Sequence, residues 1–187
     1  MARTRQVEIR FRTWGGARKG AGRPPKGKRA LVSHLARPEF AGRFPLHVTL
    51  RMREGVWNLR TQRCLAPLRQ AFADGGERFG LRLVHYSVQG NHIHLLVEAG
   101  GKEALSLGMQ GLGVRIARAL NRVMKRRGSV FADHYHARVL RTPAEVARVR
   151  SYLLRNAERH YGLCGTDPYA STEAVRRPRT WLLRRHC

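Results

Sequence analysis

The sequence has few cysteines and no long apolar run. Its three cysteines, Cys64, Cys164 and Cys187, are odd in number and widely spaced, so they provide neither a disulfide framework nor a zinc-binding spacing. This usage fits a reducing compartment. No apolar stretch approaches the roughly 20 residues that span a bilayer, and residues 1–12 contain no apolar signal-peptide core. We therefore expect a cytoplasmic protein that has no membrane partner.

Acidic residues are also scarce, because 12 Asp and Glu stand against 37 Lys and Arg among 187 residues, a formal net charge of +25. With 42% hydrophobic residues the chain can still build a core, which excludes wholesale disorder. Residues 1–38 carry a net charge of +10, residues 39–164 carry +12 and residues 165–187 carry +3. Since the charge is not confined to a tail, it indicates a surface that binds a polyanion, and nucleic acid is the leading partner. A nucleic-acid partner would associate the protein with a bacterial nucleoid.

The charge and composition divide the chain into three parts. Residues 1–38 are predicted to be a flexible basic tail rich in Gly and Pro, residues 39–164 a folded domain, and residues 165–187 a basic C-terminal tail. In the first tail, Gly22-Arg23-Pro24 resembles the core of an AT-hook, whose arginine enters the A·T minor groove. We favour the simpler interpretation, a cationic arm that contacts phosphates without sequence preference. The tail cations expected to contact DNA are Arg18, Lys19, Arg23 and Lys26.

Hydropathy patterns predict the elements of the folded part. Strands are expected over 45–52, 81–88, 92–98 and 135–140, and helices over 61–79, 103–127 and 143–161. A tight-turn signal at 89–91 predicts a hairpin between the second and third strands. Thr142, Pro143 and Glu145 form the sequence signature of a capping box before the last helix. The order β-α-β-β-α-β plus a helix predicts an α+β, ferredoxin-like fold: an antiparallel sheet with the first two helices on one face, leaving the other for the last helix and a substrate.

The expected helix over 103–127 carries a row of basic residues on a different face from its apolar stripe. The row is Arg115, Arg118, Arg122 and Lys125. Such rows are often solvated surface, but in a chain this basic we interpret the row as lining a path for DNA phosphates.

Two histidines lead the predicted strand over 92–98. Because side chains alternate along a strand, His92 and His94 are expected on the open face of the sheet. The alternate residues, Ile93, Leu95 and Val97, are expected to point to the helices. Two imidazoles at i and i+2 lie close enough to bind one metal ion. Glu98 is a fallback third ligand, and for His47 we expect a surface or substrate-contacting role.

The segment 87–98, with its His-Ile-His, resembles the HUH single-strand nucleases, and specifically the REP-associated tyrosine transposases and their insertion-sequence relatives. The resemblance extends over residues 44–162. It implies a tyrosine nucleophile on the last helix, at Tyr152, and a metal site of His92 and His94 completed by Asn156 one turn after the nucleophile. The metal would be Mg²⁺ or Mn²⁺, because phosphoryl chemistry favours hard cations.

Four other tyrosines compete with Tyr152 for the role of nucleophile. Tyr86 has the parity of a core residue, and Tyr135 lies on a predicted strand that matches the scaffold of the family it resembles. Tyr161 lies at the end of the last helix, and Tyr169 lies in the C-terminal tail. We favour Tyr152 because it matches the motif.

The resemblance implies a metal-dependent endonuclease and strand transferase acting on single-stranded DNA, at repeats that form hairpins. Attack by tyrosine would give a 5′-phosphotyrosine and a free 3′-hydroxyl, and this covalent bond keeps the energy needed to rejoin strands. A divalent cation would offset the phenol's pKa near 10. Two alternatives stay open: a DNA-binding module that has lost cleavage, and a metal-dependent hydrolase that does not use Tyr152. Both a monomer and a homodimer are compatible with the sequence.

Overall fold

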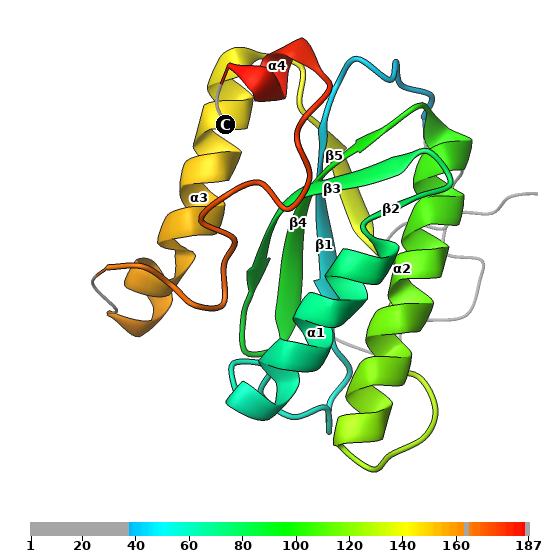
Figure 1. Cartoon of the computed structure of the whole chain (residues 1–187), viewed down its shortest axis with the longest axis vertical. Helices are drawn as coiled ribbons and strands as arrows, with labels where there is room; N and C mark the ends of the chain where they lie inside the picture. Colours follow the sequence, from blue (N-terminus) through cyan, green and yellow to red (C-terminus); the bar gives the residue numbers. More distant parts are fainter. Residues whose placement is uncertain (1–37, 163–164, 186–187) are drawn as a thin grey trace, which may run out of the picture. The chain divides into compact units, whose positions relative to one another are not determined.

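The computed structural model describes residues 38–162 and 165–185 (Figure 1). Its elements are β1 (Leu46–Arg51), α1 (Gln62–Gly75), β2 (Glu77–Arg78), β3 (Leu81–Val88), β4 (His92–Ala99), α2 (Lys102–Val123), β5 (His136–Val139), α3 (Pro143–Tyr161) and α4 (Trp181–Arg184). The five strands form one antiparallel sheet in the order β2-β3-β4-β1-β5. Apart from the short β2, this is the strand order of the ferredoxin-like plan, so the predicted α+β fold class is confirmed.

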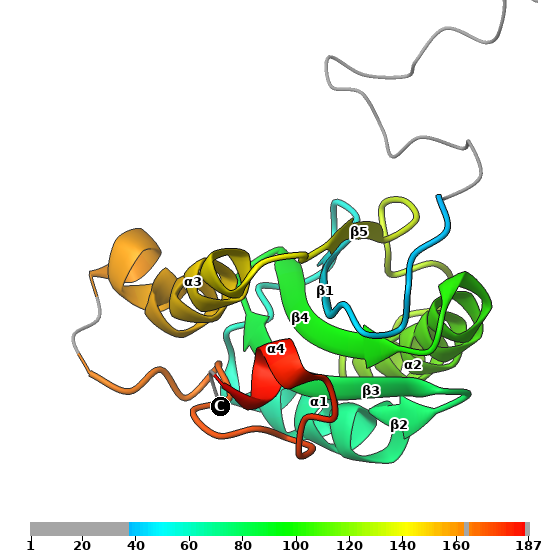
Figure 2. The same cartoon turned by 90° about the horizontal axis from the view of Figure 1, so that it is seen from above.

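Both faces of the sheet are covered, by different helices (Figures 1 and 2). The larger core lies between the sheet and the pair α1 and α2, and it contains Ile93, Leu95 and Val97 of β4, as the alternation predicts. On the other face a smaller cluster joins α3 and α4 to β3 and β4; its buried members are Val84, Leu96, Leu140, Val146, Leu153, Leu182 and Leu183. The two helices that follow the sheet in sequence therefore share the face on which His92 and His94 are expected.

α1 ends four residues earlier than its pattern predicts. The helix stops at Gly75, and Glu77–Arg78 form the short strand β2, which pairs with the start of β3. Phe79, expected near the buried face of the helix, is instead exposed, with φ of 54°, in a tight turn followed by Gly80 at φ of 76°. Two consecutive glycines at 75–76 disfavour further helix, and the pairing with β3 then determines the local structure.

α2 also ends before its predicted boundary, at Val123, and Lys125 lies outside the helix with φ of 49°. Near its start, α2 packs very closely on β3: a Cβ built on Gly108 would lie 2.2 Å from Leu81 Cβ. A glycine at this position is what allows the helix backbone to approach the strand.

Residues 165–185, predicted as a basic C-terminal tail outside the domain, belong to the same compact unit as the domain. They run along the outer edge of β3, where the N–H of Val88 donates to the Tyr169 carbonyl at 2.8 Å and the N–H of Val175 donates to the Val84 carbonyl at 2.8 Å. α4 then packs on α3 (Figure 2). The segment therefore protects an otherwise open sheet edge. Within the described residues, no helix has the length and apolar character to cross a membrane.

Candidate active site

β4 and α3 bring His94 and Tyr152 together on the face of the sheet opposite α1 and α2. The Tyr152 hydroxyl lies 3.3 Å from His94 Nε2, and the two rings meet edge-on with centroids 5.2 Å apart. His94 is buried and Tyr152 is half-buried. The capping box that begins α3, with reciprocal bonds between Thr142 and Glu145, is formed as its sequence predicts. It fixes the start of the helix that carries Tyr152.

His92 lies beside His94, as expected for alternate residues of one strand. Their ring centroids are 4.7 Å apart at an interplanar angle of 85°, and His92 Nδ1 is 2.8 Å from the side-chain oxygen of Asn91. The two imidazole rings therefore lie next to each other, and His94 contacts the helix that carries Tyr152.

His47, for which a surface or substrate-contacting role is expected, is half-buried and contacts His94. Its Nε2 lies 3.1 Å from His94 Nδ1, and the Thr49 hydroxyl lies 3.2 Å from the same nitrogen. Both contacts follow from the register of β1 and β4, in which Thr49 is opposite His94. Burial, aided by the nearby His136 and Arg138, lowers the pKa of His47 to about 4, so its ring is neutral at neutral pH. The alternation of His47 and Thr49 along β1 was the available sequence signal.

Asn156 lies one turn after Tyr152 and is fully buried. Neither its side-chain oxygen nor its nitrogen has a hydrogen-bond partner among the described residues. A buried amide left without a partner costs free energy, so its presence calls for a ligand or an ordered solvent molecule. Gln89 has a related arrangement: its Nε2 donates to the Ser87 hydroxyl at 2.8 Å, and its buried oxygen has no hydrogen-bond partner in the described part of the chain.

The side chains of His92, His94 and Asn156 carry nitrogen and oxygen atoms of the kind that bind a divalent cation. In the part of the chain that the structure describes, no group of three or more His, Cys, Asp or Glu could hold a metal ion. The amide oxygen of Asn156 would therefore have to complete the set begun by His92 and His94. Its lack of any other partner is consistent with that role.

Glu98 is not available as the fallback ligand. Its carboxylate accepts the backbone N–H of Arg179 at 2.9 Å, and both the N–H and the hydroxyl of Thr180 at 2.7 Å. Thr180 is the residue that precedes α4. Glu98 therefore anchors the start of α4 and has a structural role.

The other tyrosines lie in different surroundings. Tyr86 is buried against Phe72, with ring centroids 4.6 Å apart, so its assignment to the core is confirmed. Tyr135 packs against the larger core. The Tyr161 hydroxyl accepts the N–H of Gly90 at 3.2 Å, and Tyr169 stacks on the guanidinium of Arg60.

A cavity of about 570 Å³ opens beside Tyr152. Its lining residues are His47, Arg138, Arg148, Val149, Ser151, Tyr152, Arg155 and Glu158. Three arginines and one glutamate make this cavity basic, and it lies next to the candidate nucleophile.

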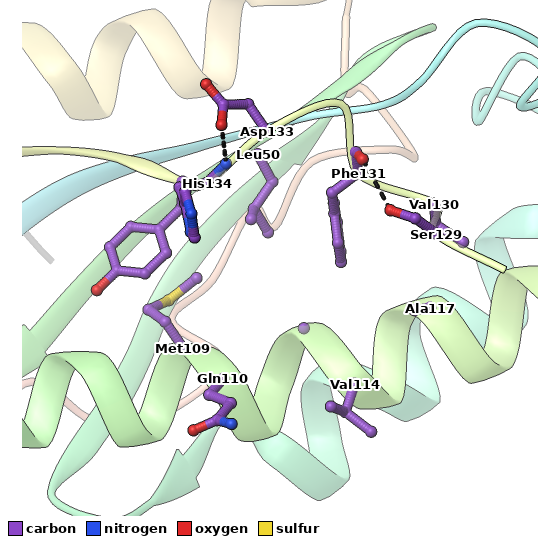
Figure 3. Close-up of a pocket in the computed structure, with 12 residues that line it drawn as sticks. Leu50, Met109, Gln110, Val114, Ala117, Ser129, Val130, Phe131, Asp133 and His134 are labelled. Atoms are coloured by element: carbon purple, nitrogen blue, oxygen red, sulfur yellow. Dashed lines mark hydrogen bonds between the residues drawn. The ribbon is translucent and has the colours of Figure 1, made fainter. Parts of the chain in front are cut away.

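The basic row predicted on α2 does not border this cavity. α2 covers the opposite face of the sheet, and Arg115 there donates to the Gly111 carbonyl. A smaller pocket of about 290 Å³ does adjoin α2, with Met109 and Val114 on one side and Phe131 on the other (Figure 3). It lies on the face away from Tyr152. The tail cations Arg18, Lys19, Arg23 and Lys26 lie outside the described residues.

Comparison with known proteins gives one family and a similar fold. Residues 44–156, more than half of the chain, match the family model described as "Transposase IS200 like". No curated protein matches the chain. A solved REP-associated tyrosine transposase bound to a REP hairpin is 15% identical, with 75% of this chain and 82% of that chain covered and a TM-score of 0.60. A putative transposase from Deinococcus radiodurans is 18% identical, with 58% and 86% covered and a TM-score of 0.44.

Proposed function

The chain belongs to the IS200-like transposase family and is a DNA transposase of the HUH tyrosine type, and from this premise we propose that Tyr152 cleaves and rejoins single-stranded DNA with the help of a divalent cation. The observation that carries the proposal is the 3.3 Å approach of the Tyr152 hydroxyl to His94 Nε2, on a helix that one turn later carries Asn156, whose buried amide has no hydrogen-bond partner among the described residues. Together these groups supply a nucleophile and a set of metal-binding atoms in one place.

Each side chain of the site has a separate role in the proposed reaction. Tyr152 Oη attacks the scissile phosphorus, the bond to the 3′-oxygen breaks, and a 5′-phosphotyrosine and a 3′-hydroxyl result. The phenolic proton leaves Oη, and the departing oxygen gains one, so protons balance. His92, His94 and Asn156 would hold Mg²⁺ or Mn²⁺, which when bound supplies positive charge at the phosphate. The contacts of His47 and Thr49 with His94 Nδ1 orient its ring, leaving Nε2 to face the reacting groups.

The proposed substrate is a single strand that carries a hairpin-forming repeat. Support comes from the REP hairpin bound in the similar transposase and from the net charge of +25, which favours a polyanion. A covalent phosphotyrosine would conserve the energy of the broken bond, so the same site would carry out strand joining.

The first prediction concerns the nucleophile. Tyr152→Phe is expected to abolish the covalent protein–DNA adduct while leaving DNA affinity nearly unchanged, because the substitution removes the attacking hydroxyl and keeps the ring. The adduct is measured on denaturing gels with a labelled single-stranded hairpin and Mn²⁺. Tyr135→Phe is the matched control and should form the adduct at the wild-type rate. An adduct that persists in Tyr152→Phe and disappears in Tyr135→Phe would reassign the nucleophile.

The same assay separates the alternatives. A wild-type protein that binds the hairpin tightly and never forms an adduct would be a binding module that has lost cleavage. Cleavage without an adduct, equally fast in Tyr152→Phe, would indicate a hydrolase that activates water. Full activity with a chelator present would remove the metal from the mechanism.

A further inference from the structure

The surroundings of Tyr152 on α3 suggest how the DNA backbone lies. Arg148 precedes Tyr152 by four residues and Arg155 follows it by three, so both lie on the same face of the helix as the nucleophile. All three line the cavity beside Tyr152, together with Arg138 of β5. At a rise of about 1.5 Å per residue, Arg148 and Arg155 are separated by about 10 Å along the helix axis, with Tyr152 between them.

Arg148 and Arg155 are not paired with acidic side chains of the described domain. Among the described residues, neither Arg148 nor Arg155 has an ion-pair or hydrogen-bond partner, and both side chains are exposed. Arg138, by contrast, pairs with Glu145 at 2.7 Å. Glu158 is the acidic residue in the cavity wall. The cavity is therefore lined by two arginines that make no ion pair or hydrogen bond with other described residues, one on each side of Tyr152 along the helix.

We propose that this cavity is the subsite for the sugar–phosphate backbone around the cleaved bond, with Arg148 and Arg155 binding the phosphates on either side of the scissile one. The inference rests on the proposed function, because it takes Tyr152 as the nucleophile. A guanidinium presents a planar fork of N–H donors that matches phosphate oxygens, and this recognition does not depend on sequence. The strand would then run along α3, and the scissile phosphate would face Tyr152 Oη.

The sequence predicts phosphate contacts along the basic row of α2, whereas this proposal assigns the contacts nearest the cleaved bond to α3. The basic row of α2 lies across the sheet from Tyr152, so it cannot hold the phosphates next to the cut, although it remains able to bind DNA farther along. By holding the two neighbouring phosphates, Arg148 and Arg155 would position the scissile phosphate for attack by Tyr152, so they should affect the rate of adduct formation as well as affinity.

The test compares two double variants that lose the same charge. Arg148→Ala/Arg155→Ala removes the proposed contacts, and Arg63→Ala/Arg78→Ala removes two exposed arginines on α1 and β2. Binding of single-stranded hairpin DNA is measured between about 50 and 200 mM salt, a range over which affinity that depends on phosphate contacts falls steeply. Adduct formation is measured at saturating DNA. Because all four side chains are exposed, both variants should melt within a few degrees of wild type.

The first variant should lose at least about tenfold in affinity, and its salt slope should fall by about 1.4, the value for two phosphate contacts on a single strand. Its adduct rate should fall by at least about tenfold, whereas the control should retain the wild-type slope and rate. Equal losses in both variants would overturn the subsite, since the effect would then be one of net charge. Replacing single phosphates near the cut by neutral methylphosphonates should weaken DNA binding by the wild type and leave DNA binding by the first variant unchanged. If the methylphosphonates also weaken binding by the first variant, the proposed subsite is wrong.

The two proposals fail in different ways. If wild type forms no adduct but the first variant still loses its salt slope, the phosphate subsite stands and the proposed chemistry is wrong. If adducts form normally through Tyr152 in both double variants, the chemistry stands and the subsite is wrong.

Discussion

His94 is the residue on which the site depends, because its two ring nitrogens face different elements. Nδ1 lies near His47 and Thr49 of β1, and Nε2 lies near Tyr152 of α3. The register of β1 against β4 produces the first contact. A slip of one residue would turn His94 to the helices α1 and α2 and remove it from Tyr152. The site geometry is therefore a consequence of strand pairing.

The second prediction concerns His85, a buried histidine on β3 whose Nδ1 lies 3.1 Å from the Ser171 hydroxyl. Burial, reinforced by the positive charge of Arg150, lowers its pKa from 6.5 to about 4, although a hydrogen bond with the Ser171 backbone acts in the opposite direction. Between these pKa values the unfolded chain binds a proton that the folded chain does not. The free energy of unfolding is therefore unaffected by His85 above pH 6.5, and it decreases as the pH falls toward 4.

For His85 this loss amounts to about 2 kcal/mol between pH 7 and pH 5. Urea unfolding of wild type and His85→Gln at both pH values measures it, and the variant should show a pH dependence smaller by that amount. His47 contributes in the same direction and is the reason some dependence should remain. Identical pH dependence in the two proteins would show that His85 takes up its proton equally readily in the folded and unfolded states.

The sequence could place some residues of the site and not others. His92 and His94 on the open face and Tyr152 on a capped helix all follow from periods that lie within one element, and each lies where its pattern predicts. The contact of His47 with His94 depends on the pairing of two strands, which neither strand encodes alone. The structural role of Glu98 likewise does not follow from its own strand, since its partners lie 81 and 82 residues away.

At the scale of elements, the segment 165–185 departs most from its sequence interpretation. Its basic composition predicts a C-terminal tail outside the folded domain, yet it is held by backbone bonds to β3 and by a buried ion pair. Asp167 binds the guanidinium of Arg60 through both oxygens, at 2.8 and 2.9 Å. That guanidinium also lies between the rings of Tyr161 and Tyr169, at 4.5 and 4.4 Å. A partner 107 residues distant leaves no local signal in the sequence.

The third prediction is that Asp167→Ala destabilises the domain by about 3 kcal/mol, because it leaves the buried Arg60 charge without its carboxylate counter-charge. The control is Glu39→Ala, which breaks a pair with Lys102 whose carboxylate is 78% exposed, and it should cost less than about 1 kcal/mol. Urea denaturation at pH 7 gives both values. Losses of similar size would mean that the Arg60–Asp167 pair contributes no more than a surface pair and does not hold the segment.

At the scale of the whole molecule, the candidate site is assembled from one chain. α3 packs on its own sheet through Val146 and Leu153, which share a cluster with Leu96 of β4 and with Leu182 and Leu183 of α4. The segment that sequence composition treats as a tail therefore helps to hold the Tyr152 helix against the strand that bears His94. This arrangement predicts that each chain supplies the nucleophile of its own site.

The fourth prediction follows from that arrangement. Tyr152→Phe and His94→Ala should each be inactive, and a mixture of the two should remain inactive, because neither chain offers an intact Tyr152 next to an intact His94. If α3 were exchanged between subunits, mixed dimers would contain one complete site and adduct formation would return. Wild type mixed with either variant is the control and should keep its own activity. The result does not depend on whether the protein is a monomer or a homodimer, since the experiment tests which chain supplies the tyrosine to each pair of histidines.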